Sequence, residues 1–418
     1  MDSLNTGPAL RQYRMVTLSY WGFTLTDGAL RMLVVLYFHQ LGYSPIAVAA
    51  LFIFYEFFGM VTNLFGGWLA AHSGLTTTLH IGLSLQLMAL GMLLVDPAWL
   101  SLIYVMAAQA LSGIAKDLNK MSAKSSIKLL LPAAAQGKLY RWVALLTGSK
   151  NTLKGLGFFI GALLLSSVGF RGAILVLFLG LMLLCIASFL LLERDIGKAQ
   201  YPVKFRQLFS KSPTINRLSA ARFFLFGSRD LWFVVALPVY LQSELGWDYS
   251  AVGALMALWI IGYGGVQVIA PKLTQGRRQS SPCGKTALHW ILALSLVPAI
   301  IACALHYRLA DAASILIIGL AVYGILFAIN SSLHSYLIVA YAQRNGVSLD
   351  LGFYYMANAA GRLSGTLLSG LLYQWQGLEA CLFAASAFIA LGCLLSLSLA
   401  NYQARSQALK TTSPQIQP

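Results

Sequence analysis

Long apolar stretches alternate with short polar segments along almost the whole chain. Each stretch has about 20 residues, the length that an α-helix needs to cross roughly 30 Å of hydrocarbon. The pattern predicts an all-α polytopic membrane protein with twelve transmembrane helices. The first six are expected at 13–39, 45–71, 75–95, 99–121, 140–167 and 172–192, and the second six at 218–244, 250–273, 286–306, 313–341, 348–374 and 378–402.

Basic residues between the predicted helices gather on one side of the membrane. That side has Arg11 and Arg14, the basic segment between the sixth and seventh helices, and Arg405 with Lys410 in the tail. By the positive-inside rule, both termini are therefore expected in the cytoplasm. Since Arg11 and Arg14 lead into a full-length span without a cleavage site, the first helix is expected to stay in the protein. The net charge of +16 follows from this topology and requires no nucleic-acid partner.

An internal repeat relates the two halves of the chain. LGYSPIAVAAL, which begins at Leu41, matches LGWDYSAVGAL, which begins 204 residues later at 245. The same shift places Gly157 on Gly361 and Gly161 on Gly365, although small-residue patterns also recur by chance in membrane helices. We predict two parallel six-helix bundles at 1–193 and 218–418, a cytoplasmic linker at 194–217, and a substrate site between the bundles.

This architecture resembles the major facilitator superfamily. Members of that family usually carry a glycine-leucine-alanine-aspartate-arginine-x-glycine-arginine pattern between the second and third helices. Here GGWLAAHSGLTTT keeps Gly67, Leu69, Ala70 and Gly74 but has Ala71 at the acidic position. The charge locks attributed to that loop elsewhere in the family are therefore not expected here.

Several cations lie inside the predicted helices, where a charge costs about 2.5–3.5 kcal/mol on insertion scales and normally faces an aqueous cavity. They outnumber the acids in or near the spans, which are Asp27, Glu56, Asp117, Asp230 and Asp350. A surplus of positive charge predicts an anionic substrate. The candidate substrate-binding residues are Arg31, Lys116, Lys120, Lys150, Lys154, Arg229 and Arg362.

Four lysines recur at every fourth position, at 116, 120, 124 and 128. Residues four apart drift only about 40° around a helix, so these lysines form one slowly winding stripe. We expect Lys116 and Lys120 to contact substrate. We expect Lys124 and Lys128 to act as snorkelling anchors at the cytoplasmic face.

The remaining cations differ in how specific their signal is. Lys150 and Lys154 are four residues apart and lie too deep for snorkelling to rescue both. Arg229 and Arg362 carry guanidinium groups that suit the bidentate binding of oxyanions. The adjacent Asp230 weakens the case for Arg229 as a substrate contact, although adjacent helical residues point about 100° apart.

Asp27 and Glu56 are the candidates for proton coupling. Asp27 and Arg31 form an i, i+4 pair that either neutralises itself or exchanges a proton for substrate. Glu56 lies deep in the second helix without a partner in its own turn. His334 is expected to be a satisfied interior histidine.

Signals for catalysis and metal binding are weak. CGKT at 283–286 lacks the upstream glycine of a phosphate loop, and the sequence has no HExxH or GxSxG motif. The five cysteines show no clustered spacing. We expect no enzyme activity, no cofactor and no metal site.

A closer resemblance rests on YWGFTLTDGALRMLVVLYFHQLGYSP, FYEFFGMVTNLFGGWLAA, QALSGIAKDLNKMSAKSSIK and TGSKNTLKGLGFFIG. These segments resemble ArsJ-type organoarsenical efflux permeases, a bacterial branch of the superfamily. The resemblance implies a monomer in the bacterial inner membrane that exports 1-arseno-3-phosphoglycerate and confers arsenate resistance. It also implies a metabolic partner, glyceraldehyde-3-phosphate dehydrogenase, which makes that ester when arsenate replaces phosphate.

Other functions remain open at this point. The main alternative is a facilitator-type antiporter for another phosphorylated organic anion or an inorganic oxyanion. A membrane sensor or scaffold would not need cations inside five helices, and a cationic-drug exporter is disfavoured by the sign of the charge. The coupling ion is not determined.

Overall fold

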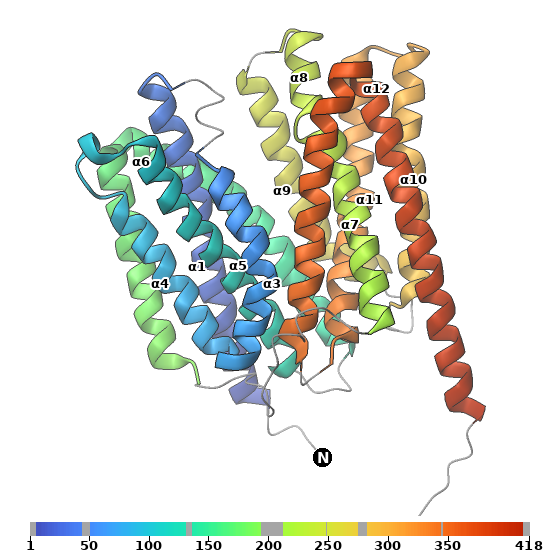
Figure 1. Ribbon diagram of the computed structural model, residues 1–418, viewed down its shortest axis with the longest axis horizontal. Helices are drawn as coiled ribbons and strands as arrows, with labels where there is room; N and C mark the ends of the chain where they lie inside the picture. Colours follow the sequence, from blue (N-terminus) through green and yellow to red (C-terminus); the bar gives the residue numbers. More distant parts are fainter. Residues whose placement is uncertain are drawn as a thin grey trace, which may run out of the picture. The chain divides into compact units, whose positions relative to one another are not determined.

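A computed structural model describes residues 6–43, 51–130, 136–193, 212–247, 249–274, 282–343 and 346–412 (Figure 1). Within these residues the regular secondary structure is helical, with no strand. The elements are α1 (Thr6–Gln40), α3 (Ile53–Ser73), α4 (Leu75–Met92), the 3-10 helix η1 (Pro97–Trp99), α5 (Leu102–Leu130), α6 (Gln136–Leu191), α7 (Pro213–Phe233), α8 (Ala236–Ser243), α9 (Tyr249–Thr274), α10 (Gly284–His306), α11 (Ala312–Tyr341) and α12 (Val347–Thr412).

Seven helices in the described ranges are long and apolar enough to cross a membrane. Two of these segments, Leu139–Leu191 and Val347–Leu397, have 53 and 51 residues. At 1.5 Å per residue each is more than twice as long as one crossing requires. The segments therefore have the length for two crossings each, and the total of twelve spans stays a prediction.

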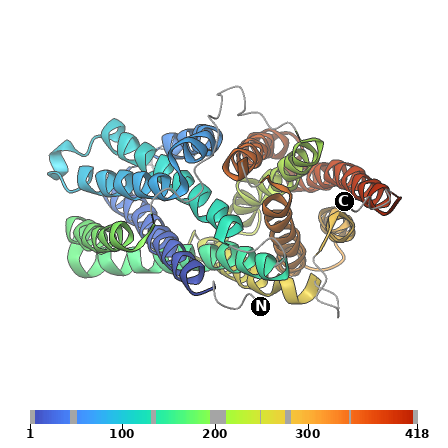
Figure 2. The same ribbon diagram turned by 90° about the horizontal axis from the view of Figure 1, so that it is seen from below.

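The chain reverses direction inside α6, at Gly169. Gly169 has φ 69°, in the left-handed region that glycine tolerates best. The limb before it runs parallel to α1, as the pairs Tyr13–Trp142 and Ala29–Gly161 show. The limb after it runs antiparallel to α1, as the pairs Gly22–Leu184 and Gln12–Leu191 show. The predicted fifth and sixth helices are these two limbs, and Figure 2 shows α1 and α6 obliquely, from below.

The same reversal occurs in α12, where Gly377 has φ 74°. The limb before it runs parallel to α7 and α8, as the pairs Phe223–Gly361 and Ser243–Tyr373 show. The limb after it runs antiparallel to α7, as the pairs Gly227–Phe388 and Ala221–Gly392 show. These limbs correspond to the predicted eleventh and twelfth helices.

Close contacts at the repeated glycines are equivalent in the two halves. A methyl group on Gly157 would lie 2.5 Å from the carbonyl oxygen of Leu25 in α1. A methyl group on Gly361 would lie closer still to the carbonyl oxygen of Phe223 in α7. The prediction that Gly157 and Gly361 allow helices to pack closely is confirmed, because backbone occupies the space that a side chain would need.

Contacts between Cα atoms divide the chain into two compact units. The first is Met1–Phe209 with Ala342–Met356, and the second is Ser210–Tyr341 with Ala357–Pro418. The predicted bundle boundaries at 193 and 218 stay predictions, and most of the predicted linker, at 194–211, lies outside the described residues. Arg277, Arg278 and Arg344, which are basic residues between predicted helices, also lie outside the described residues.

Several predicted helices differ from the structure in their extent, two of them in ways that matter for the site. The predicted seventh helix is interrupted at Val234 and Val235, which separate α7 from α8. The predicted fourth helix continues to Leu130, so all four lysines of the stripe are on the continuous helix α5.

Candidate functional site

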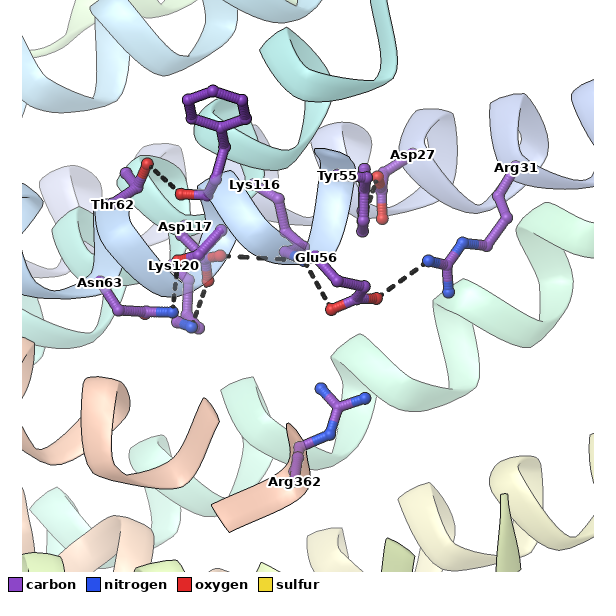
Figure 3. Close-up of polar contacts among 12 residues, drawn as sticks. Asp27, Arg31, Tyr55, Glu56, Thr62, Asn63, Lys116, Asp117, Lys120 and Arg362 are labelled. Carbon is purple, nitrogen blue, oxygen red and sulfur yellow. Dashed lines mark hydrogen bonds and ion pairs between the residues drawn. The ribbon is translucent and has the colours of Figure 1, made fainter. Parts of the chain in front are cut away.

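Ionisable side chains from α1, α3 and α5 meet in the first unit (Figure 3). None of these three helices is among the seven segments of the described residues that are long and apolar enough, with few enough charges, to cross a membrane. We call this group the acid–base cluster. It consists of Asp27 and Arg31 from α1, Tyr55 and Glu56 from α3, and Lys116, Asp117 and Lys120 from α5.

Two glycines let α3 and α5 approach closely enough for these contacts. A methyl group on Gly113 would collide with the carbonyl oxygen of Tyr55. A methyl group on Gly59 would lie 2.6 Å from Oδ2 of Asp117. The small residues therefore create the space in which the carboxylate and the tyrosine backbone lie.

Glu56 bridges two cations from different helices. Its Oε1 accepts a 3.0 Å hydrogen bond from Nη2 of Arg31, and its Oε2 lies 3.8 Å from Nζ of Lys116. The side chain is 47% exposed, whereas those of Arg31 and Lys116 are 25% and 19% exposed. Glu56 is thus the accessible acid of the cluster, and its partners come from α1 and α5.

Asp27 is bound by Tyr55. The hydroxyl of Tyr55 donates a 2.7 Å hydrogen bond to Oδ1 of Asp27, and both residues are buried. Of the two alternatives for Asp27, an i, i+4 ion pair with Arg31 is not what the structure shows, because the arginine extends toward α3 and pairs with Glu56. Its guanidinium lies 4.7 Å from the ring centroid of Tyr55, where the π face attracts a cation.

Asp117 is shared by two lysines of the stripe. Its Oδ2 lies 3.8 Å from Nζ of Lys116, and its Oδ1 accepts a hydrogen bond from Lys120. The side chain of Asp117 is only 3% exposed. The sequence analysis did not include Asp117 among the site residues. Its position directly after Lys116 could have indicated that it belongs to the site.

The other two lysines of the stripe differ in their burial. Lys124 is 4% exposed, and its Nζ lies 4.9 Å from the ring centroid of Tyr355. Nζ of Lys120 lies 4.7 Å from the same ring. The snorkelling interpretation is therefore wrong for Lys124. Lys128 is partly buried and donates a hydrogen bond to the carbonyl oxygen of Ala342, and its role as an anchor stays a prediction.

Lys154 comes close to the cluster from α6. Its carbonyl oxygen would lie 2.7 Å from a methyl group on Gly28, directly after Asp27. Its ammonium lies 5.8 Å from the ring centroid of Phe158 and interacts electrostatically with Arg31, Asp27, Lys116 and Lys150. Within the described ranges Lys154 forms no ion pair, and Lys150 is partly buried one turn away.

A second group, which we call the arginine–aspartate triad, lies in the second unit. Asp230 is 1% exposed; its Oδ1 lies 2.5 Å from Nη2 of Arg229, and its Oδ2 accepts a 3.0 Å hydrogen bond from Nε of Arg362. The concern that the adjacent Asp230 weakens Arg229 as a substrate contact therefore applies, because the long arginine side chain folds back along the helix to pair with it.

Arg222 is a further buried cation of the second unit. It is 4% exposed, donates a 2.9 Å hydrogen bond to Oδ1 of Asn358, and lies 3.7 Å from the ring centroid of Phe226. It precedes Arg229 by seven residues, which is two helical turns on one face. That spacing could have identified Arg222 from the sequence as a further cation of the site.

His334 differs from its prediction. It is fully buried in α11, but neither ring nitrogen has a hydrogen-bond partner among the described residues. It is an interior histidine, as expected, but not a satisfied one.

The net charge of the acid–base cluster, Lys154 and the arginine–aspartate triad indicates which ligands they can bind. The acid–base cluster contains three acids and three bases, so it is neutral when all are ionised. Lys154 adds a positive charge beside it, and the triad holds two arginines on one aspartate. In the described part of the chain no group of three or more metal-ligating residues gathers. The arrangement suits the binding of an anion and the movement of protons.

Known families and structures agree on the fold. The model of the Major Facilitator Superfamily matches residues 16–284 and 218–416. Among curated proteins none matches this sequence.

Three solved transporter structures are similar to this chain. The human organic anion transporter MFSD10 (TETRAN) has a TM-score of 0.71 and 15% identity, covering 93% of this chain and 99% of its own. A bacterial homologue of the iron transporter ferroportin, in an outward-facing state, has a TM-score of 0.72 and 15% identity, with the same coverage. The E. coli fucose:proton symporter FucP has a TM-score of 0.69 and 11% identity, covering 92% and 97%. At these identities the likeness concerns the fold.

Proposed function

The chain belongs to the Major Facilitator Superfamily, whose members are membrane transporters, and on that premise we propose that it exports an anionic organoarsenical, 1-arseno-3-phosphoglycerate, from the cytosol. The proposed substrate contacts are Arg31, Lys116, Lys120, Lys150 and Lys154 in the first unit and Arg229 and Arg362 in the second. Glyceraldehyde-3-phosphate dehydrogenase would supply the substrate, and the exporter would act as a monomer in the bacterial inner membrane with both termini in the cytoplasm.

One observation carries the anionic part of the proposal. Lys154 is a cation inside a membrane helix without an ion pair in the described ranges, next to a cluster whose own charges balance. An unneutralised cation in hydrocarbon is costly, so a ligand that carries negative charge would be stabilised there. Arsenate and phosphate groups are hydrogen-bond acceptors with several oxygens, which lysine and arginine bind well.

The membrane potential favours this direction of transport. In a cell that is negative inside, each negative charge leaving the cytosol gains about 2.3 kcal/mol per 100 mV. A substrate with several negative charges therefore needs less proton coupling for export than a neutral one.

The test is arsenic uptake by everted membrane vesicles. The vesicles receive arsenate, glyceraldehyde-3-phosphate and NAD, with and without glyceraldehyde-3-phosphate dehydrogenase. We expect uptake that requires the dehydrogenase and that falls at least tenfold in Lys154→Gln and in Lys150→Gln. Lys272→Gln is the matched control, because Lys272 is an exposed lysine at the end of α9.

Other results would redirect the proposal. Uptake of arsenate without the dehydrogenase would make the protein an inorganic oxyanion carrier. No arsenic uptake under either condition would favour another phosphorylated organic anion. Full activity of the Lys154→Gln variant would contradict the cationic site itself.

A further inference from the structure

Glu56 has the position that an anionic ligand of the acid–base cluster would take. Each of its carboxylate oxygens faces a different cation, Arg31 at 3.0 Å and Lys116 at 3.8 Å. A carboxylate that bridges a guanidinium and an ammonium has the same donors around it as a bound phosphate or arsenate oxygen pair would have.

The three acids of the cluster differ in how easily a ligand can replace them. Asp27 is 5% exposed and bound by the hydroxyl of Tyr55, and Asp117 is 2% exposed and bound by Lys120. Glu56 is 47% exposed, and its side chain has more rotatable bonds than that of aspartate. Glu56 can therefore leave Arg31 and Lys116 more easily than either buried aspartate can leave its partner.

We propose that Glu56 is a built-in competitor of the substrate: the substrate anion displaces its carboxylate from Arg31 and Lys116, and Glu56 takes up a proton from solvent when it is displaced. This inference rests on the proposed function, since it concerns the same cations.

The charged groups around Glu56 set the sign of this linkage. From α1 it faces Arg31, with Asp27 four residues before; from α5 it faces Lys116, with Asp117 beside it; from α6, Lys154 interacts with both of these cations. When a substrate anion binds Arg31 and Lys116, an ionised Glu56 is left beside a second negative charge. Protonation removes that repulsion, so anion and proton bind together.

This mechanism is the opposite of proton–substrate exchange, because Glu56 binds its proton together with the substrate and not in place of it. A bound anion that brings one proton to Glu56 crosses the membrane with one negative charge fewer. Asp27, bound by Tyr55, serves to position α1 against α3 and is not the group that takes up the proton.

The experiment measures binding of 3-phosphoglycerate to the purified full-length protein by calorimetry. Titrations at pH 7.5 in buffers of different ionisation enthalpy give the number of protons taken up on binding. In the wild type we expect proton uptake that Glu56→Gln abolishes. We also expect Glu56→Gln to bind the probe about tenfold more tightly, because the competing carboxylate is gone. Any proton uptake that remains in Glu56→Gln belongs to the probe itself and is subtracted from the value for the wild type.

Two further variants keep the test specific. Glu56→Asp has a carboxylate too short to bridge both cations, so it should bind with intermediate affinity and still take up a proton. Glu193→Gln removes an exposed acid elsewhere in the first unit and should behave as the wild type.

Two results would overturn the inference. If Glu56→Gln bound the probe with the same affinity and the same proton uptake as the wild type, the competitor role would be rejected. The proposed function would then remain intact. Binding to neither protein, in samples that elute as folded monodisperse protein, would reject both.

Discussion

The Tyr55 hydroxyl donates a 2.7 Å hydrogen bond to Asp27, while the Tyr55 ring lies under two cations. Nζ of Lys116 is 3.9 Å from the ring centroid, and Cζ of Arg31 is 4.7 Å from it. One neutral side chain therefore joins an acid of α1 to bases of α1 and α5. Replacing Tyr55 by phenylalanine would remove the hydrogen bond to Asp27 and keep the ring that contacts the two cations.

Tyr55→Phe should lower both stability and transport. A hydrogen bond to a buried carboxylate contributes about 1–2 kcal/mol, and its loss leaves Asp27 without its donor. We expect a lower midpoint of thermal unfolding in detergent and slower vesicle uptake. Tyr20→Phe is the control, because Tyr20 is buried on α1 and its hydroxyl has no hydrogen-bond partner in the described residues. Equal effects of the two variants would show that the Tyr55–Asp27 bond contributes nothing specific.

The arginine–aspartate triad should respond unequally to loss of its members. Asp230→Asn leaves two arginines without their shared acid, and removing one partner of a buried ion pair costs about 3–5 kcal/mol. Arg362→Gln keeps the pair of Arg229 with Asp230 and removes a side chain that is 40% exposed. We expect Asp230→Asn to reduce the yield of folded protein strongly. Arg362→Gln should fold normally and lose transport, and normal transport by Arg362→Gln would remove it from the proposed substrate contacts.

The repeated glycines should tolerate no side chain. Gly157→Ala and Gly361→Ala place a methyl group against backbone oxygens that have no room to move, and overpacking of this kind costs about 1–3 kcal/mol. Both variants should unfold at lower temperature than the wild type. Gly180→Ala is the matched control, because nothing lies within 4 Å of its added methyl group. Because alanine favours a helix more than glycine does, Gly180→Ala should unfold no earlier than the wild type, and a control that unfolds as early as the two variants would contradict the packing account.

Asp311 should make the start of α11 sensitive to acid. Its Oδ2 accepts a 2.8 Å hydrogen bond from the backbone N–H of Ser314, and this bond lowers the pKa of the carboxyl group. A lowered pKa in the folded state means that the stabilisation is present above the unfolded pKa, about 3.9, and is lost as the pH falls through the lower folded value.

The measurement is the midpoint of thermal unfolding as a function of pH. Asp311→Ala should unfold earlier than the wild type at pH 7, and the difference should shrink below pH 4. Asp311→Asn keeps an acceptor oxygen that does not titrate, so its cap should not depend on pH. A constant difference between the alanine variant and the wild type from pH 7 to pH 3 would contradict this account.

Much of the fold could be predicted from the sequence because hydrocarbon leaves a chain few choices. Apolar stretches of about 20 residues must form helices there, since every backbone polar group needs an internal partner. The repeat was visible at Gly157 and Gly361 because close helix packing restricts those positions to the smallest residue. The break between α7 and α8 at Val234 and Val235 had a signal that the prediction did not use, because Pro238 has no N–H to donate to the carbonyl oxygen of Val234 four residues before it.

The sequence by itself determined which charges lie inside the helices, and hence that each needs a partner or an aqueous surrounding. Only the tertiary structure decided the partners: Glu56 for Arg31, Tyr55 for Asp27, and Asp230 for both Arg229 and Arg362. The physical reason is that the cost of an embedded charge depends on the residue and its depth, whereas its pairing depends on which helices touch at that depth. Long side chains reach across a helix contact as easily as along a helix, so spacing in the sequence does not fix their partners.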